Sequence, residues 1–147
     1  VEPSRPLDVT WGKKIRLLGY DLSPGLYRPG DTIHLALYYQ ALEEMDRDYT
    51  AFVQLLGPHN PSTGNPLWGQ HDGEPCRRAY PTSTWSPGEI IRDQVAITIA
   101  PEAPEDAYQL ATGLYLLETL ERLPAAGAGG NSLPDGAAVL STIEIQE

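Results

Sequence analysis

Short runs of alternating apolar and polar residues recur along this chain from Ile15 to Ile145, separated by Pro-Gly pairs and other turn residues. Alternation with a period of two is typical of β-strands that bury one face. About seven such runs occur, at a spacing between turns that is typical of a β-sandwich, although a β-barrel would produce nearly the same pattern. We predict an all-β protein, an immunoglobulin-like antiparallel β-sandwich of about seven to nine strands.

The clearest strand is predicted over residues 32–41, directly after Pro29-Gly30, which suits a type II turn because glycine accepts positive φ. Alternate residues of this strand form an apolar face that we expect in the core: Ile33, Leu35, Leu37 and Tyr39. The other expected strands cover residues 15–20, 49–56, 67–71, 90–99, 108–117 and 139–145. Residues 49–56 carry apolar side chains on both faces, which is typical of a central strand, and residues 67–71 are expected to pair with it as a hairpin.

The segments between these strands complete the predicted organisation. Residues 1–10, with prolines at positions 3 and 6, are expected to form a linker, and residues 11–147 a single β-sandwich domain. Residues 41–47 are compatible with a helical turn, and residues 124–136, rich in Ala and Gly, with a flexible loop. The sequence Asp106-Ala-Tyr108 resembles the tyrosine corner of immunoglobulin-like sandwiches.

Composition and charge narrow the classes of partner. The formal net charge of −10, from 20 acidic and 10 basic residues, disfavours binding to nucleic acid and to anionic lipid. The chain holds no apolar run of about 18 residues, so direct insertion of this chain into a membrane is not expected. Its single cysteine, Cys76, has no partner for an internal disulfide. The chain starts at Val1 and its one methionine is Met45, so we interpret it as a piece of a longer polypeptide.

Residues with catalytic or metal-binding chemistry do not form a recognisable constellation. Acidic pairs such as Glu43-Glu44 lie in expected turns, where solvated charge explains them better than a glycosidase carboxylate pair. The segment His71–Cys76 is a local cluster of candidate metal ligands, but its spacing differs from the regular spacing of zinc sites, and we favour a plain loop. We therefore predict no enzyme activity, no metal and no cofactor.

Aromatic residues suggest one candidate binding region. The irregular segment from Trp68 to Trp85 is long, and function concentrates on long loops that a rigid scaffold carries. Exposed aromatic rings can stack on sugar rings, although packing at the end of the core is the favoured interpretation for Trp85. The candidate ligand-binding residues are Trp68, Gln70, Asp72, Arg78, Tyr80 and Trp85.

Short motifs occur along the chain in a specific order: Ile15–Asp21, Arg28–Asp31, Asp46–Thr50, Tyr80–Ser83, Trp85–Glu89 and Gly113–Tyr115. Together they resemble the C-terminal extracytoplasmic β-sandwich domain of bacterial, Chloroflexi-type multi-pass membrane proteins of the family-39-like glycosyltransferase or mannosyltransferase type. The resemblance covers the chain from about Trp11 to Ile145. It departs after Tyr115, where Leu116–Arg122 replaces a turn richer in Asp, Pro and Gly.

The resemblance implies a noncatalytic accessory domain on the extracytoplasmic face of the bacterial cell membrane, within a larger membrane protein whose membrane portion carries out the transfer chemistry. The expected partner is the parent protein's transmembrane region, with carbohydrate as a further candidate. Three alternatives stay open: a free-standing carbohydrate-binding module, a structural protein-interaction domain with no ligand and, ranked third, a glycosidase, which would require two facing carboxylates in a cleft. The carbohydrate-binding module would need exposed aromatic rings with polar neighbours on one face or in one groove.

Overall fold

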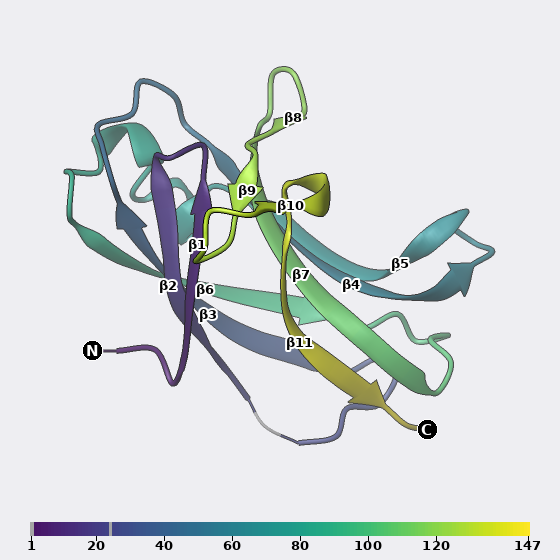
Figure 1. The fold of residues 1–147 in the computed structure, drawn as a ribbon. Coiled ribbons are helices and arrows are strands. Elements are labelled where there is room, and N and C mark those ends of the chain that lie inside the picture. Colours follow the sequence, from purple (N-terminus) through teal and green to yellow (C-terminus); the bar gives the residue numbers. More distant parts are fainter. Residues whose placement is uncertain (1, 24) are drawn as a thin grey trace.

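The computed structural model of this protein describes residues 2–23 and 25–147, except for the side chains of Arg77 and Arg78. Two antiparallel sheets pack face to face, which confirms the predicted immunoglobulin-like β-sandwich (Figure 1). Sheet A has the strand order β10-β9-β1-β2-β3-β6, and sheet B has the order β11-β7-β4-β5, with β8 pairing with β7. In the described part of the chain, no helix is long and apolar enough to cross a membrane.

The strands have the following bounds. Sheet A contains β1 (Arg5–Trp11), β2 (Ile15–Leu22), β3 (Thr32–Ala41), β6 (Ile90–Thr98), β9 (Ala125–Ala126) and β10 (Ser132–Leu133). Sheet B contains β4 (Thr50–Asn60), β5 (Asn65–Gly73), β7 (Asp106–Leu116), β8 (Glu121–Arg122) and β11 (Ala138–Ile145). Three short 3-10 helices lie in the connections: η1 (Pro75–Arg78), η2 (Thr82–Thr84) and η3 (Pro134–Gly136).

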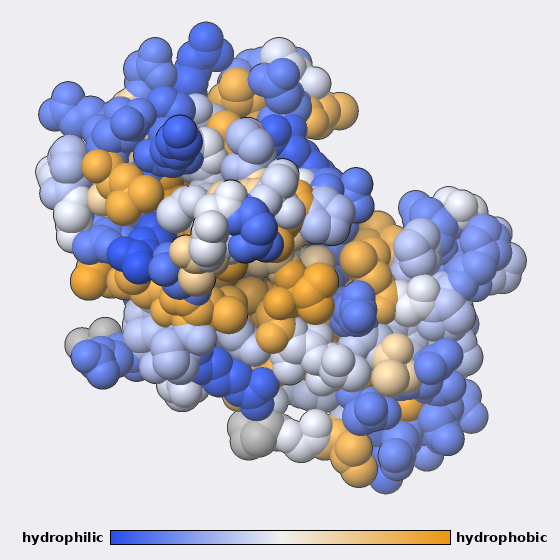
Figure 2. All heavy atoms as spheres, viewed as in Figure 1, coloured by the Kyte–Doolittle hydropathy of each residue, from blue (hydrophilic) through white to orange (hydrophobic). Residues whose placement is uncertain are grey.

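Alternate side chains of β3 and β6 enter the core as the sequence pattern predicts. The four predicted core residues of β3 are all at most 3% exposed: Ile33, Leu35, Leu37 and Tyr39. The turn before β3 also forms as expected, because the Asp31 amide donates to the Arg28 carbonyl oxygen at 3.0 Å and Gly30 has φ +89°. Hydrophobic residues lie mainly across the middle of the view in Figure 2, whereas hydrophilic residues cover the projecting end of the β4–β5 hairpin.

The predicted tyrosine corner is confirmed at the start of β7. Tyr108 is fully buried, and its hydroxyl donates to the backbone carbonyl oxygen of Pro104 at 2.6 Å. A second tyrosine, Tyr27, makes the same kind of contact, because its hydroxyl donates to the carbonyl oxygen of Ser23 at 2.6 Å. Each tyrosine therefore fills the core with its ring while its hydroxyl satisfies a backbone acceptor four residues upstream.

Residues 5–10, which we expected in a linker, belong instead to strand β1, which pairs with β2. The prolines at positions 3 and 6 obscured this strand, because proline cannot donate a hydrogen bond to a sheet and is confined to strand edges. Pro6 is tolerated here because β9 pairs only with Thr10 and Trp11 of β1. Gly19 of β2 makes room for the N-terminal segment: a Cβ there would lie 2.4 Å from the Arg5 carbonyl oxygen and 2.7 Å from the Pro3 side chain.

Two further expectations about connections are wrong. Residues 41–47 contain no helical turn: Ala41 ends β3, and residues 42–47 are irregular. Residues 124–136 are not one irregular loop, since they contain β9, β10 and η3 and join sheet A through the pairing of β9 with β1. The indole nitrogen of Trp11 donates to the Gly136 carbonyl oxygen at 3.0 Å, and this contact helps to hold the segment in place.

The core contains one unusual polar atom, the hydroxyl oxygen of Tyr39. This oxygen is buried and has no hydrogen-bond partner among the described residues. Burial raises the pKa of Tyr39 far above its usual value, the negative charge of Asp93 acts in the same direction, and the nearby Thr112 side chain acts to a smaller extent in the opposite direction. An unpaired buried hydroxyl costs free energy, so Tyr39 stabilises the fold through its ring and not through its oxygen.

The same substitution at two core tyrosines should therefore have opposite effects on stability. Tyr108→Phe removes a hydrogen bond and should lower the free energy of unfolding by about 1 kcal/mol. Tyr39→Phe removes an unpaired polar atom and should raise it by up to about 1 kcal/mol. Urea unfolding with linear extrapolation measures both changes. A loss of stability in Tyr39→Phe as large as in Tyr108→Phe would contradict the assignment of the unpaired hydroxyl.

Candidate functional site

The two tryptophans predicted as candidate ligand-binding residues lie in the core. Trp68 is 5% exposed, donates from its indole nitrogen to the Pro58 carbonyl oxygen at 2.8 Å, and meets the ring of Tyr108 edge-on. Trp85 is 2% exposed and donates to the Tyr80 carbonyl oxygen at 2.8 Å, so the packing interpretation of Trp85 is confirmed. In this conformation neither ring has a free face on which a sugar could stack.

Tyr80 stabilises the turn that leads into β6 through a hydrogen bond to Glu89. Its hydroxyl donates to the carboxylate of Glu89, with distances of 2.7 and 2.6 Å to the two oxygens, and the Ser86 amide donates to the same carboxylate. These contacts lower the pKa of Glu89, the Ser86 amide most, and the bond to Glu89 raises the pKa of Tyr80. Arg78, another predicted ligand-binding residue, has a side chain outside the described part of the chain.

Gln70 and Asp72 lie on the outer face of sheet B, where the structure brings them together with Tyr115 of β7. The Gln70 amide nitrogen donates to one oxygen of Asp72 at 2.8 Å, and the Tyr115 hydroxyl donates to the other oxygen at 2.8 Å. A hollow of about 180 Å³ opens beside them, which we call the Asp72 hollow. Its lining residues are Phe52, Gln54, Asp72, Tyr115, Leu120 and Arg122.

The β7–β8 hairpin forms the rim of the Asp72 hollow. Arg122 places its guanidinium 4.1 Å above the ring centre of Phe52, and the Tyr115 ring lies 6.2 Å from the same ring, so this outward-facing phenylalanine is only 2% exposed. Leu120 stands at the hairpin turn with φ +61° and is 68% exposed. Leu116–Arg122 therefore forms a tight hairpin although it lacks the Asp, Pro and Gly residues of the resembled family.

A larger groove lies on the outer face of sheet A and was not predicted from the sequence. Its volume is about 460 Å³, and it runs across β2, β3 and β6. We call it the sheet A groove, and its lining residues are Asp21, Leu22, Ser23, His34, Leu35, Ala36, Arg92, Gln94, Val95 and Ala96. Charged and polar side chains thus share its walls with short apolar ones.

Small side chains at paired positions explain why the outer face is hollow here. Ala36 and Ala96 lie on neighbouring strands, where Ala36 pairs with Gln94 and Ala96 pairs with His34. Side chains of paired residues project to the same face of a sheet, so each alanine stands beside a longer polar side chain. Next to them, Tyr38 pairs with Arg92, which also lines the groove.

Three side chains from three strands form a hydrogen-bonded chain beside the groove. Nε of Arg92 donates to the Tyr38 hydroxyl at 3.0 Å, and that hydroxyl donates to Oδ2 of Asp21 at 2.6 Å. The backbone amide of Ser4 donates to Oδ1 of the same carboxylate at 2.7 Å. The bond from Tyr38, followed by the contact with Ser4, lowers the pKa of Asp21, so this carboxylate is ionised at neutral pH.

The candidate metal ligands lie dispersed over the described residues, and Cys76 lines neither hollow. Among the described residues, no group of three or more His, Cys, Asp or Glu side chains is arranged to hold a metal ion. Cys76 is half-buried, and its sulfur contacts the Arg92 carbonyl oxygen at 3.6 Å. Burial raises the pKa of the Cys76 thiol, and Asp93 adds to the effect, which disfavours the reactive thiolate.

The residues of the sheet A groove escaped the sequence analysis because they are far apart along the chain. Asp21, Tyr38 and Arg92 meet only through the pairing of β2 with β3 and of β3 with β6. One usable signal was present: two alanines stand among the outward positions of β3 and β6, where longer polar side chains are usual. Short side chains among the outward, polar positions of two paired strands therefore indicate a candidate hollow.

Comparisons with known proteins bear on the fold alone. No protein-family model matches this chain, and no curated protein matches it. A Niemann-Pick type C2 protein from the Japanese carpenter ant is similar with a TM-score of 0.52 and 8% identity, over 88% of this chain and 91% of that protein. The CARDB domain of a Pyrococcus furiosus protein, solved in complex with di-metal ions, covers 99% of this chain and 93% of its own at 11% identity and a TM-score of 0.44.

The contact between Tyr115 and Asp72 can be tested by titration. Burial, the hydrogen bond to Asp72 and the charge of Asp72 raise the pKa of Tyr115 to about 12 from the usual 10.0. Asp72→Asn removes the charge and should lower this pKa, measured from the ring resonances of Tyr115 by NMR. The pKa of Tyr108, also about 12 through burial and Asp106, should stay unchanged and is the internal control.

The raised pKa also predicts a pH window for stability. The folded state holds the Tyr115 proton more tightly than the unfolded state, so the associated stability is complete below about pH 10 and is lost as the pH rises to about 12. In Asp72→Asn that loss should be complete at a lower pH. An unchanged Tyr115 pKa in Asp72→Asn would show that Asp72 does not act on this phenol.

Proposed function

We propose that this chain is a noncatalytic, extracytoplasmic accessory domain of a membrane-bound glycosyltransferase-like protein, and that the sheet A groove binds a saccharide. The observation that carries the proposal is the groove itself, about 460 Å³ in volume and lined by a carboxylate, a guanidinium, an imidazole, an amide and a hydroxyl. Binding sites for small molecules commonly measure about 300–1,000 Å³ and combine apolar walls with a few placed polar groups. The membrane context comes from the resemblance of the motifs.

The chemistry of the groove suits a hydroxyl-rich ligand. Asp21 accepts hydrogen bonds, Arg92 donates them, and Gln94 does both, so hydroxyl groups of either orientation find partners. Ala96, which is exposed on β6, supplies a short apolar surface for the C–H groups of a sugar ring, whereas Ala36, also in the lining, is only 5% exposed. The hydrogen bonds among Asp21, Tyr38 and Arg92 hold the polar groups in place before a ligand arrives, which lowers the entropic cost of binding.

The noncatalytic part of the proposal rests on the distribution of carboxylates. Most glycosidases need a pair of carboxyl groups across the scissile bond. Among the described residues, the sheet A groove has one lining carboxylate, Asp21, and the Asp72 hollow has one, Asp72. Recognition without hydrolysis fits this arrangement better than glycoside cleavage.

A second candidate function is a packing domain with no ligand, which contacts the transmembrane region of its parent protein. The burial of Trp68 and Trp85 favours it, because the aromatic rings expected to stack on sugars are used in the core. A free-standing carbohydrate-binding module would use the same groove as the accessory domain. Its sugar binding would therefore be the same, and only the parent polypeptide would differ.

Filling the groove tests the proposed function. Ala96→Tyr places a bulky side chain in the groove from an exposed position on β6, where tyrosine is a good strand former. We expect wild-type protein to bind at least one polysaccharide in a panel of envelope and common polysaccharides, and Ala96→Tyr to bind it at least about tenfold more weakly, because the added ring occupies the ligand's volume. A glycan array followed by affinity electrophoresis measures both.

Ile90→Tyr is the matched control for this experiment. Ile90 lies on the same face of the same strand, is 55% exposed and does not line the groove, so sugar binding should persist in this variant. Urea unfolding should show that both variants are folded. Absence of binding to every polysaccharide by folded wild-type protein would overturn the proposal and leave the packing domain as the better description.

A further inference from the structure

We propose that the sheet A groove is selective for an acidic saccharide, and that Arg92 binds its carboxylate. This inference rests on the proposed function, since it names the class of sugar that the same groove would take. It follows from the way in which Arg92 is held, from the groups that hold it and from the local balance of charge.

Arg92 is oriented by two contacts with Tyr38. Its Nε donates to the Tyr38 hydroxyl at 3.0 Å, and its guanidinium carbon lies 5.7 Å from the centre of the Tyr38 ring. A guanidinium has five N–H donors in a planar fork. With Nε engaged, the two terminal amino groups form no hydrogen bond to a residue in the described ranges. Together they match the two oxygens of a carboxylate.

Tyr38 and Asp21 act as positioning residues for Arg92. Tyr38 is 2% exposed, so its hydroxyl cannot move freely, and it donates to Asp21 at 2.6 Å. Asp21 is held in turn by the backbone amide of Ser4 at 2.7 Å. Because the Tyr38 hydroxyl donates its hydrogen bond to the Asp21 carboxylate, the lone pairs of the Tyr38 oxygen are left to accept from Arg92, and this direction of bonding orients the fork.

The charge around the groove permits an anionic ligand in an acidic protein. The protein carries 20 acidic and 10 basic residues, but one acidic and one basic residue line the groove, Asp21 and Arg92. Two hydrogen bonds to Asp21 disperse its negative charge. Charges elsewhere on the surface are largely screened beyond about 8 Å at physiological ionic strength. A charge-assisted bond to Arg92 can therefore outweigh the repulsion by the rest of the molecule.

The test compares one polymer in two charge states. Polygalacturonate and its methyl ester share a backbone, and esterification removes the carboxylate charge without removing the ring hydroxyls. We expect wild-type protein to bind polygalacturonate at least about tenfold more tightly than the methyl ester, because charge-assisted bidentate hydrogen bonds are about twice as strong as neutral ones. Affinity electrophoresis of the full chain measures the ratio of the two affinities, which we call the acid selectivity.

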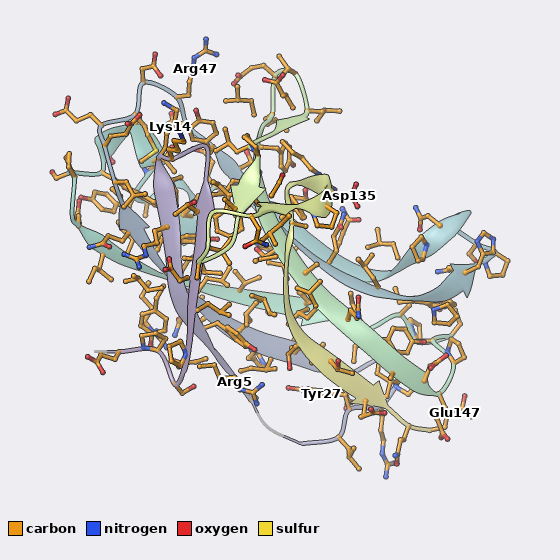
Figure 3. All side chains as sticks on the ribbon, viewed as in Figure 1. Arg5, Lys14, Tyr27, Arg47, Asp135 and Glu147 are labelled. Carbon is orange, nitrogen blue, oxygen red and sulfur yellow. The ribbon has the colours of Figure 1, made fainter. Side chains whose placement is uncertain are left out.

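Variants assign the acid selectivity to particular atoms. Arg92→Gln should abolish it, Arg92→Lys should retain only part of it because an ammonium lacks the planar fork, and Tyr38→Phe should reduce it because the ring stays while the orienting hydroxyl is lost. Arg47→Gln is the matched control. Arg47 lies in the connection between β3 and β4, at the end of the sandwich opposite Arg5 (Figure 3). Ser4, which precedes Arg5 in the chain, contacts Asp21 of the groove, so Arg47→Gln removes the same charge away from the groove.

The outcomes separate this inference from the proposed function. Equal binding of both polymers, binding of neutral polysaccharides alone, or acid selectivity that survives in folded Arg92→Gln would overturn the acidic-saccharide inference and leave saccharide binding in the groove intact. Failure of folded wild-type protein to bind any polysaccharide, charged or neutral, would overturn both. Acid selectivity lost in Arg92→Gln and kept in Arg47→Gln supports the inference, and urea unfolding of each variant excludes a trivial loss of fold.

Discussion

The burial of alternate side chains between two sheets is the constraint on which the rest of this structure depends. Two aromatic pairs lie in that layer. Trp68 and Tyr108 of sheet B pack edge-on against each other, and Tyr39 of sheet A packs at a tilt against Trp85. Large aromatic rings bury much apolar area, so these residues contribute strongly to the burial between the sheets. As a result, the aromatic residues best suited to sugar stacking are committed to the core, and recognition falls to polar side chains on the outer faces.

The two hollows on those outer faces share a common arrangement. In each one, the hydroxyl of a tyrosine on one strand donates a hydrogen bond to an aspartate on another strand: Tyr38 to Asp21 in sheet A, and Tyr115 to Asp72 in sheet B. In each one, an arginine also lies over an aromatic ring, Arg92 over Tyr38 and Arg122 over Phe52. Such contacts fix charged side chains without burying them, which suits a site that must present polar groups to a ligand.

The hollows differ in what forms their edge. In the sheet A groove the walls are strands, and the gap arises because alanine occupies two neighbouring outward positions. In the Asp72 hollow a hairpin turn supplies Leu120 and Arg122, so its shape depends on a connection between strands. Sites built on paired strands are held more firmly than sites on loops, and this difference is a reason to place recognition in the sheet A groove.

The sequence by itself determined the elements and their faces, because period-two alternation and Pro-Gly turns are local: residues 32–41 formed the predicted strand, and Tyr108 formed the predicted corner. It did not reveal β1, because two prolines indicated a linker there, and only the packing of this segment against Gly19 places it beside β2. The tertiary structure alone decided that Trp68 and Trp85 are core residues and that Asp21, Tyr38 and Arg92 meet. Strand register decides which side chains come into contact. Register arises from the pairing of segments that are distant in the sequence, so no local pattern reveals it.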